Sequence, residues 1–161
     1  MRDAGFTLIE ILVTLAVIAI VMGIAVVQLG ESDGRVAGRE AERLSLLLDA
    51  ARDEAINGGR PLAWSTDGHG YQFWLQDDQN NWQVLSTQEE FRQRSLPEGL
   101  QITRQSTNLR QQPIGERIVF EPSGVNALFQ LDMALGEQHW RVDGDVTGQV
   151  HATQVEADAG K

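Results

Sequence analysis

The pattern of apolar and polar residues begins with a long apolar run. Residues 6–27 are almost unbroken in their apolar character. As an α-helix this run would span about 33 Å, close to the roughly 30 Å of hydrocarbon in a bilayer. A secretory signal would instead have a shorter apolar core followed by a small-residue cleavage site. We therefore expect residues 6–29 to form a helix that crosses a membrane once.

A second helical pattern follows over residues 30–60, where apolar side chains recur at helical spacing among charged ones. The apolar positions are Leu44, Leu47, Leu48, Ala51 and Ala55. Gly58-Gly59 followed by Pro61 predicts that this helix ends near Asn57. Three intervening glycines each cost about 1 kcal/mol relative to alanine in a helix interior, so one bent helix and two helices both remain open. These glycines are Gly30, Gly34 and Gly38.

Residues 61–151 change to short runs of aromatic and branched residues separated by turn residues, which predicts an antiparallel sheet. The expected strands are Leu62–Ser65, Tyr71–Leu75, Trp82–Leu85, Leu100–Arg104, Arg117–Phe120, Leu128–Ala134, His139–Val142 and Val146–Val150. Expected turns are Asp67-Gly68, Gln79-Asn80-Asn81, Gly136-Glu137 and Asp143-Gly144. Residues 106–112 lack both patterns and predict a mobile loop. Residues 152–161 are polar and acidic and predict a disordered tail.

Charge and composition narrow the function. The 23 acidic and 13 basic side chains give a formal net charge of -10, which argues against nucleic acid as a partner. Cysteine is absent.

His69, His139 and His151 lack the paired spacing of a metal motif and are interpreted as turn, strand and tail residues. Residues 77–81 are considered as a calcium site, but they lack the glycine and the terminal glutamate of an EF-hand loop. Ser123 does not lie in a nucleophile elbow. We expect no metal, no cofactor and no enzymatic activity.

The junction between the short polar leader and the apolar run carries the strongest motif. Arg2 and the free amine favour a cytoplasmic N-terminus, although Asp3 weakens that signal. The segment from Gly5 to Glu10 reads GFTLIE and resembles the leader of type IV pilins and of the pseudopilins of type II secretion. The resemblance implies that a membrane peptidase cuts after Gly5 and that the new terminal Phe6 is methylated on its amine. Such a cut preserves the apolar anchor, whereas removal of a secretory signal discards its apolar segment.

Glu10 is an acidic residue within the apolar run. A carboxylate near the centre of a membrane helix costs about 2.5 to 3.5 kcal/mol, and less near an end, so residues of this kind usually have a partner. The resemblance implies that Glu10 meets the N-terminal amine of a neighbouring subunit during filament assembly. The alternative is an ordinary signal anchor in which Glu10 lies at the membrane interface.

Two later regions resemble the H-type minor pseudopilins: residues 39–55, and residues 118–124 with the following hairpin to Val146. This resemblance implies an α+β fold in which a long N-terminal helix, transmembrane and then amphipathic, packs on a C-terminal head of two antiparallel β-sheets. The expected organisation is a leader at 1–5, a transmembrane helix at 6–29, an amphipathic helix at 30–60, a head at 61–151 and a tail at 152–161.

The same resemblance implies a place in a machine. It indicates a structural subunit near the tip of a periplasmic filament, anchored once in the bacterial inner membrane with its head in the periplasm. The implied partners are other minor pseudopilins, the major pseudopilin, the prepilin peptidase and the inner-membrane assembly platform. The alternative is a minor pilin of a type IV pilus or DNA-uptake system. Residues 142–161 contain one lysine, no arginine and four acidic side chains, which argues against DNA binding.

Overall fold

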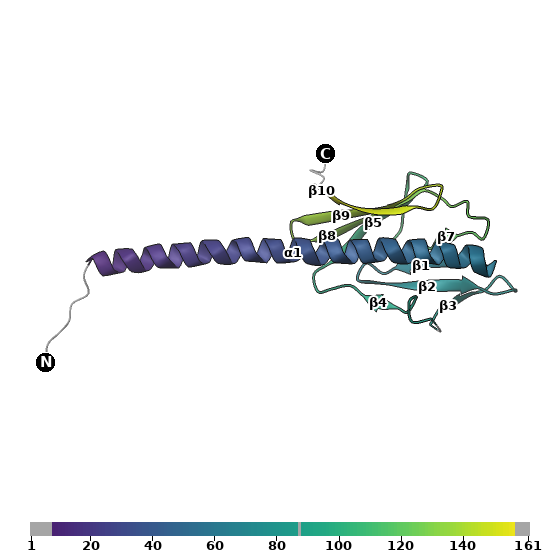
Figure 1. The fold of residues 1–161 in the computed structure, drawn as a ribbon, viewed down its shortest axis with the longest axis horizontal. Helices are drawn as coiled ribbons and strands as arrows, with labels where there is room; N and C mark the ends of the chain where they lie inside the picture. Colours follow the sequence, from purple (N-terminus) through teal and green to yellow (C-terminus); the bar gives the residue numbers. More distant parts are fainter. Residues whose placement is uncertain (1–7, 87, 157–161) are drawn as a thin grey trace.

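One long helix organises the molecule. The computed structural model describes residues 8–86 and 88–156, with the side chains of residues 22–32 excepted. Helix α1 runs without a break from Leu8 to Gly58, so a single helix replaces the two possibilities left open by the sequence. Gly59 follows in the left-handed conformation with φ 64°, as the predicted C-terminal cap requires. The N-terminal half of α1 projects away from the head, and its C-terminal half lies against both sheets (Figure 1).

The packed half of α1 buries a narrow stripe of small and branched side chains. Its fully buried positions are Ala37, Ala41, Leu44, Leu48, Ala51 and Ala55. These residues recur every three or four positions, which places them on one face of a helix. The predicted amphipathic helix is therefore confirmed, and its apolar face begins at Ala37, about two turns before the first leucine, Leu44.

The head consists of two five-stranded antiparallel sheets. The first has the order β3-β2-β1-β7, with β4 also paired to β2, and the second has the order β10-β9-β8-β5-β6. The strands of the first sheet are β1 (Leu62–Thr66), β2 (Gly70–Gln76), β3 (Trp82–Val84), β4 (Arg94–Ser95) and β7 (Ile118–Phe120). Those of the second are β5 (Gln101–Thr107), β6 (Arg110–Gln112), β8 (Phe129–Leu135), β9 (Gln138–Gly144) and β10 (Val150–Val155).

A single core joins α1 to both sheets. In the first sheet, the Tyr71 and Phe73 rings meet edge to face with centroids 6.2 Å apart. Between the sheets, Phe120 of β7 and Phe129 of β8 meet edge to face with centroids 6.1 Å apart. Aromatic pairs of this kind stabilise a core beyond the area that they bury. The expected α+β architecture with two antiparallel sheets is therefore confirmed.

The prediction of a mobile loop at residues 106–112 is wrong. Strand β5 continues to Thr107, and β6 returns along it in a hairpin with Gln105 opposite Gln112. Gln105 is fully buried, and its side-chain amide donates to the Glu116 carbonyl oxygen at 3.0 Å. A strand whose buried position is a hydrogen-bonded glutamine has no apolar alternation, so the pattern could not reveal it.

The end of the head also differs from the prediction. The last strand is β10 at Val150–Val155, instead of residues 146–150, so the head extends past residue 151 and includes part of the predicted disordered tail. Asp143-Gly144 belongs to the end of β9, and the turn lies at residues 145–148. Gly144 stands opposite Phe129, whose ring fills the space that a Cβ at residue 144 would need. This glycine serves cross-strand packing and not a turn.

Candidate functional site

In the projecting half of α1, residues 8–21 form an apolar surface that no other part of the described chain covers. Every residue from Leu8 to Val21 is exposed, and most of these side chains are large aliphatic ones. Leaving such a surface in water forfeits about 25 cal/mol for each Å² that could be buried. The segment is therefore suited to hydrocarbon or to the apolar helices of other subunits.

The described part of this segment contains two polar side chains, Glu10 and Thr14. The Thr14 hydroxyl donates to the Glu10 carbonyl oxygen at 2.7 Å, so it is satisfied within the helix. The carboxylate of Glu10 has no hydrogen bond or ion pair with any residue between 8 and 156 that the structure describes. An acid in this position needs a partner from outside the described chain once water is removed.

The predicted cleavage and methylation residues, Gly5 and Phe6, lie outside the described residues. Within the described residues no helix reaches the length and hydropathy needed to cross a membrane.

A buried polar cluster fixes the first sheet to α1. Glu40 is on the buried face of the helix, and its carboxylate binds the Arg43 guanidinium at 2.8 Å. The Tyr71 hydroxyl of β2 donates to the same carboxylate at 3.3 Å. Burial, reinforced by the negative charge of Glu40, raises the pKa of Tyr71 to about 12. The phenol therefore stays protonated as a hydrogen-bond donor at every physiological pH.

A second polar contact fixes the other sheet to α1. The Asp49 carboxylate accepts a hydrogen bond at 3.0 Å from the backbone N–H of Val150, the first residue of β10. Burial raises the pKa of Asp49, while the Val150 hydrogen bond opposes that shift. Because β10 is at the edge of its sheet, this contact satisfies an otherwise open backbone group. Together with Glu40, Asp49 sets how the head is held on the helix.

Sequence reasoning did not identify these two contacts. The helical pattern of residues 30–60 singled out neither Glu40 nor Asp49. A signal for Glu40 exists, because it lies between Ala37 and Leu44 on the stripe that the helical period assigns to the core. An acid on a buried face predicts a specific partner. No comparable signal marks Asp49.

The structure also shows where the other candidate residues from the sequence analysis lie. His69 lies in the turn between β1 and β2 and His139 in β9, as predicted, whereas His151 is in β10 and not in a tail. Asp77 closes the β2–β3 hairpin, because one of its oxygens accepts from the backbone N–H groups of Gln79 and Asn81, both at 2.9 Å. Its role in the hairpin agrees with the turn that residues 79–81 predict.

The fold and the projecting apolar helix define a pilin-like subunit. Two protein-family models that match the sequence identify its family. The model described as "Prokaryotic N-terminal methylation motif" matches residues 1–26. The model described as "Type II transport protein GspH" matches residues 40–148, about two thirds of the chain. This chain therefore belongs to the type II transport protein GspH family.

Curated relatives agree with this assignment. A type II secretion system protein H of Pseudomonas aeruginosa is 36% identical over 75 residues, which are 46% of this chain and 44% of that relative. The protein of the same name from Aeromonas hydrophila is 27% identical over 99 residues, which are 60% of this chain and 54% of that relative. The match thus spans about half the length of each relative.

Solved structures show the same fold. The crystal structure of the minor pseudopilin EpsH from the type II secretion system of Vibrio cholerae superposes with a TM-score of 0.63 and 22% identity, over 78% of this chain and 99% of that one. The solution structure of Escherichia coli GspH gives a TM-score of 0.57 and 17% identity, over 81% and 96% of the two chains. At these identities the likeness concerns the fold alone.

Proposed function

We propose that this chain is a minor pseudopilin of a type II protein secretion system, a structural subunit near the tip of the periplasmic pseudopilus. Membership of the GspH family is the observation that carries the proposal. The subunit helps to drive folded proteins through the outer membrane and performs no catalysis itself. Its partners are the other minor pseudopilins of the tip, the major pseudopilin, the prepilin peptidase and the inner-membrane assembly platform.

The N-terminus carries the processing and anchoring steps of this proposal. The prepilin peptidase removes residues 1–5 by cutting between Gly5 and Phe6, and the new amine of Phe6 is methylated. The match of residues 1–26 to the methylation motif supports both steps. Residues 6–29 then hold the subunit in the inner membrane by a single pass, with the head in the periplasm. The apolar sequence of this segment and the exposed side chains of its residues 8–21 in α1 support the anchor.

Glu10 is the residue that converts an anchored protein into a filament subunit. Its carboxylate lies on an exposed face of α1 without a partner among the described residues. Pairing with the methylated amine of an adjacent subunit neutralises two charges that hydrocarbon disfavours separately. Assembly is then favoured only between subunits that have been cleaved, because the uncut precursor has no amine at residue 6.

Secretion in the bacterium that carries this chain tests the proposal. Deleting the gene should remove the type II-dependent proteins from the culture medium, and the full chain should restore them. A Glu10→Ala chain should insert in the membrane normally but restore little secretion, because it lacks the partner for the neighbouring amine. Thr14→Ala is the matched control: it removes the other polar side chain of the described segment, whose hydrogen bond is internal to the helix.

Two results would contradict the proposal. Normal secretion after deletion would show that the chain is not a part of the secretion machine. Full restoration by Glu10→Ala, at the same membrane level as the unaltered chain, would leave the machine assignment intact but eliminate the charge-pairing role.

A further inference from the structure

The end of the head opposite the projecting helix carries exposed apolar side chains on three loops. Two of these loops lie beside the C-terminal end of α1, since Gly148 faces Arg52 and Gly124 faces Ile56. The third is the β5–β6 turn, which reaches the same end because Thr107 pairs with Phe129 at the start of β8. The exposed side chains, which we call the distal patch, are Leu109, Val125, Leu128 and Val146.

Leu109 combines two unfavourable features. It and Asn108 are the central residues of the β5–β6 turn, with φ of 63° and 51°. A hairpin turn with two positive φ values favours Asn-Gly, and a branched residue held there costs on the order of 1 kcal/mol or more. The Leu109 side chain is also 92% exposed. Glycine at this position would make the isolated subunit more stable than leucine does.

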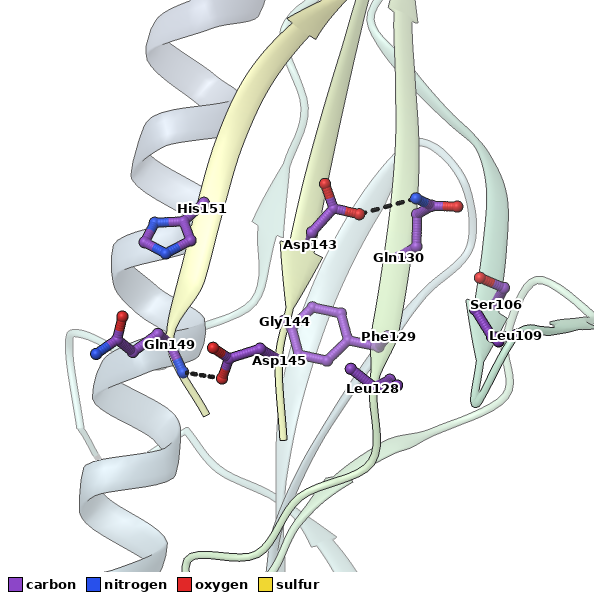
Figure 2. A pocket seen from close by; sticks show the side chains of 10 residues that line it. All are labelled: Ser106, Leu109, Leu128, Phe129, Gln130, Asp143, Gly144, Asp145, Gln149 and His151. Atoms are coloured by element: carbon purple, nitrogen blue, oxygen red, sulfur yellow. Dashed lines mark hydrogen bonds between the residues drawn. The ribbon is translucent and has the colours of Figure 1, made fainter. Parts of the chain in front are cut away.

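A pocket lies next to this leucine on the second sheet (Figure 2). Leu109, Leu128 and the edge of the Phe129 ring provide its apolar wall, and its volume is about 220 Å³. Small-molecule sites usually measure roughly 300 to 1,000 Å³. The pocket is therefore suited to a side chain from another protein.

Two fixed carboxylates border the pocket. Asp143 accepts a hydrogen bond from the Gln130 amide at 2.8 Å, and Asp145 accepts one at 3.0 Å from the Gln149 backbone N–H (Figure 2). The Thr147 hydroxyl also donates to Asp145 at 2.7 Å and, as the largest cause, holds the pKa of this carboxyl below its usual value. Among the described residues that line the pocket there is no arginine or lysine, and the remaining titratable group is His151.

The two carboxylates at the border of the pocket determine which kind of partner can bind there. Neither Asp143 nor Asp145 forms an ion pair with a described residue, so both can receive a cation from outside. A second copy of this chain fits poorly, because two molecules of net charge -10 would bring acidic borders together. An apolar centre with a charged rim is the usual arrangement of a protein-binding hot spot.

We propose that the distal patch docks the head of the next, different subunit of the pilus-like filament, through an apolar side chain flanked by lysine or arginine. The apolar side chain enters the pocket against Leu109 and Phe129, and the cation lies between Asp143 and Asp145. This inference rests on the proposed function, since it names the partner of a filament subunit. The distal position supports it, because α1 leaves the head from the opposite end (Figure 1) and the patch faces away from the anchor.

Photo-crosslinking in cells tests the proposal with the full chain. A benzophenone amino acid at Val125, on the rim of the patch, should form an adduct with another pseudopilin of the system. Mass spectrometry should place the crosslink next to a lysine or arginine of that subunit. The same probe at Val84, a partly exposed apolar position on β3, is the control and should not form this adduct.

Leu109→Gly separates docking from folding. The change should reduce the Val125 adduct by about tenfold, because it removes the apolar side chain that lines the pocket. It should also raise the melting temperature of the full chain in detergent, because glycine relieves the left-handed strain. Asn80→Gly is the matched control: Asn80 has φ 64° in the β2–β3 hairpin, so its replacement should leave the adduct unchanged.

The opposite results overturn the inference. An adduct formed only with a second copy or with a secreted protein, or an adduct insensitive to Leu109→Gly, would exclude the proposed docking. If secretion still depends on Glu10 in that case, the filament role stands and only the docking surface is lost. If deletion leaves secretion intact, the proposed function itself fails.

Discussion

Tyr71 is the one tyrosine of the chain, and its phenol is buried between β2 and α1. Because the folded pKa is about 12 and the ordinary value is near 10, the two states bind protons equally below pH 10. Between pH 10 and pH 12 the unfolded chain loses its phenolic proton first. The free energy of unfolding should therefore fall by about 1.4 kcal/mol per pH unit across this window.

Near-ultraviolet absorbance of tyrosinate measures this directly in the full chain in detergent. The midpoint should lie near 12 in the folded protein and move towards 10 when the chain is unfolded in denaturant. The alkaline loss of stability should be absent in Tyr71→Phe. A folded midpoint near 10 would show that the phenol is not buried against Glu40.

Single residues were predictable from the sequence where they break a strong pattern. Glu10 stands out because a carboxylate interrupts an apolar run, and Gly59 because glycine follows a helical period. Asp49 does not stand out, since acids are common in amphipathic helices and its partner, Val150, is distant in the sequence. Leu109 is similar: an apolar residue between polar strands does not reveal its left-handed conformation.

At the scale of elements, Gly38 determines how closely α1 approaches β9. A Cβ at this position would lie 2.7 Å from Cζ2 of Trp140, so Gly38→Ala should push the ring or the helix aside. Overpacking of this kind costs about 1 to 3 kcal/mol. The melting temperature of the full chain should fall by about 3 °C for each kcal/mol.

Gly58→Ala provides the control within the same helix. Its Cβ would meet Glu54 Oε1 at an ordinary 3.9 Å, and alanine favours helix over glycine. The melting temperature should stay the same or rise. If both variants behave alike, the close approach of Trp140 to α1 does not limit the packing.

Helices and strands could be predicted from the sequence where they have a buried apolar face. The helix and strands β1, β2, β8 and β9 have a buried apolar face and were identified from sequence periodicity. Strands β6 and β10 were missed or misplaced because they are edge strands with largely polar residues. Their positions depend on pairing with a neighbour and, for β10, on Asp49, which are tertiary contacts that the local sequence does not encode.

At the scale of the whole molecule, one helix has two environments. Its C-terminal half completes the core of the head, and its N-terminal half exposes large aliphatic side chains along its described length. The head therefore does not need the projecting half for its own packing. A protein built in this way presents its apolar helix to other helices or to a membrane while the head keeps a fixed orientation.

Cleavage and methylation at Phe6 are tested by the mass of the N-terminal peptide of the protein purified from cells that contain a prepilin peptidase. We expect a mature chain that begins at Phe6 and carries one methyl group on its amine. In cells lacking the peptidase, the same peptide should begin at Met1. A chain that still begins at Met1 when the peptidase is present would exclude the pairing of Glu10 between subunits, because a neighbour would then have no amine at residue 6.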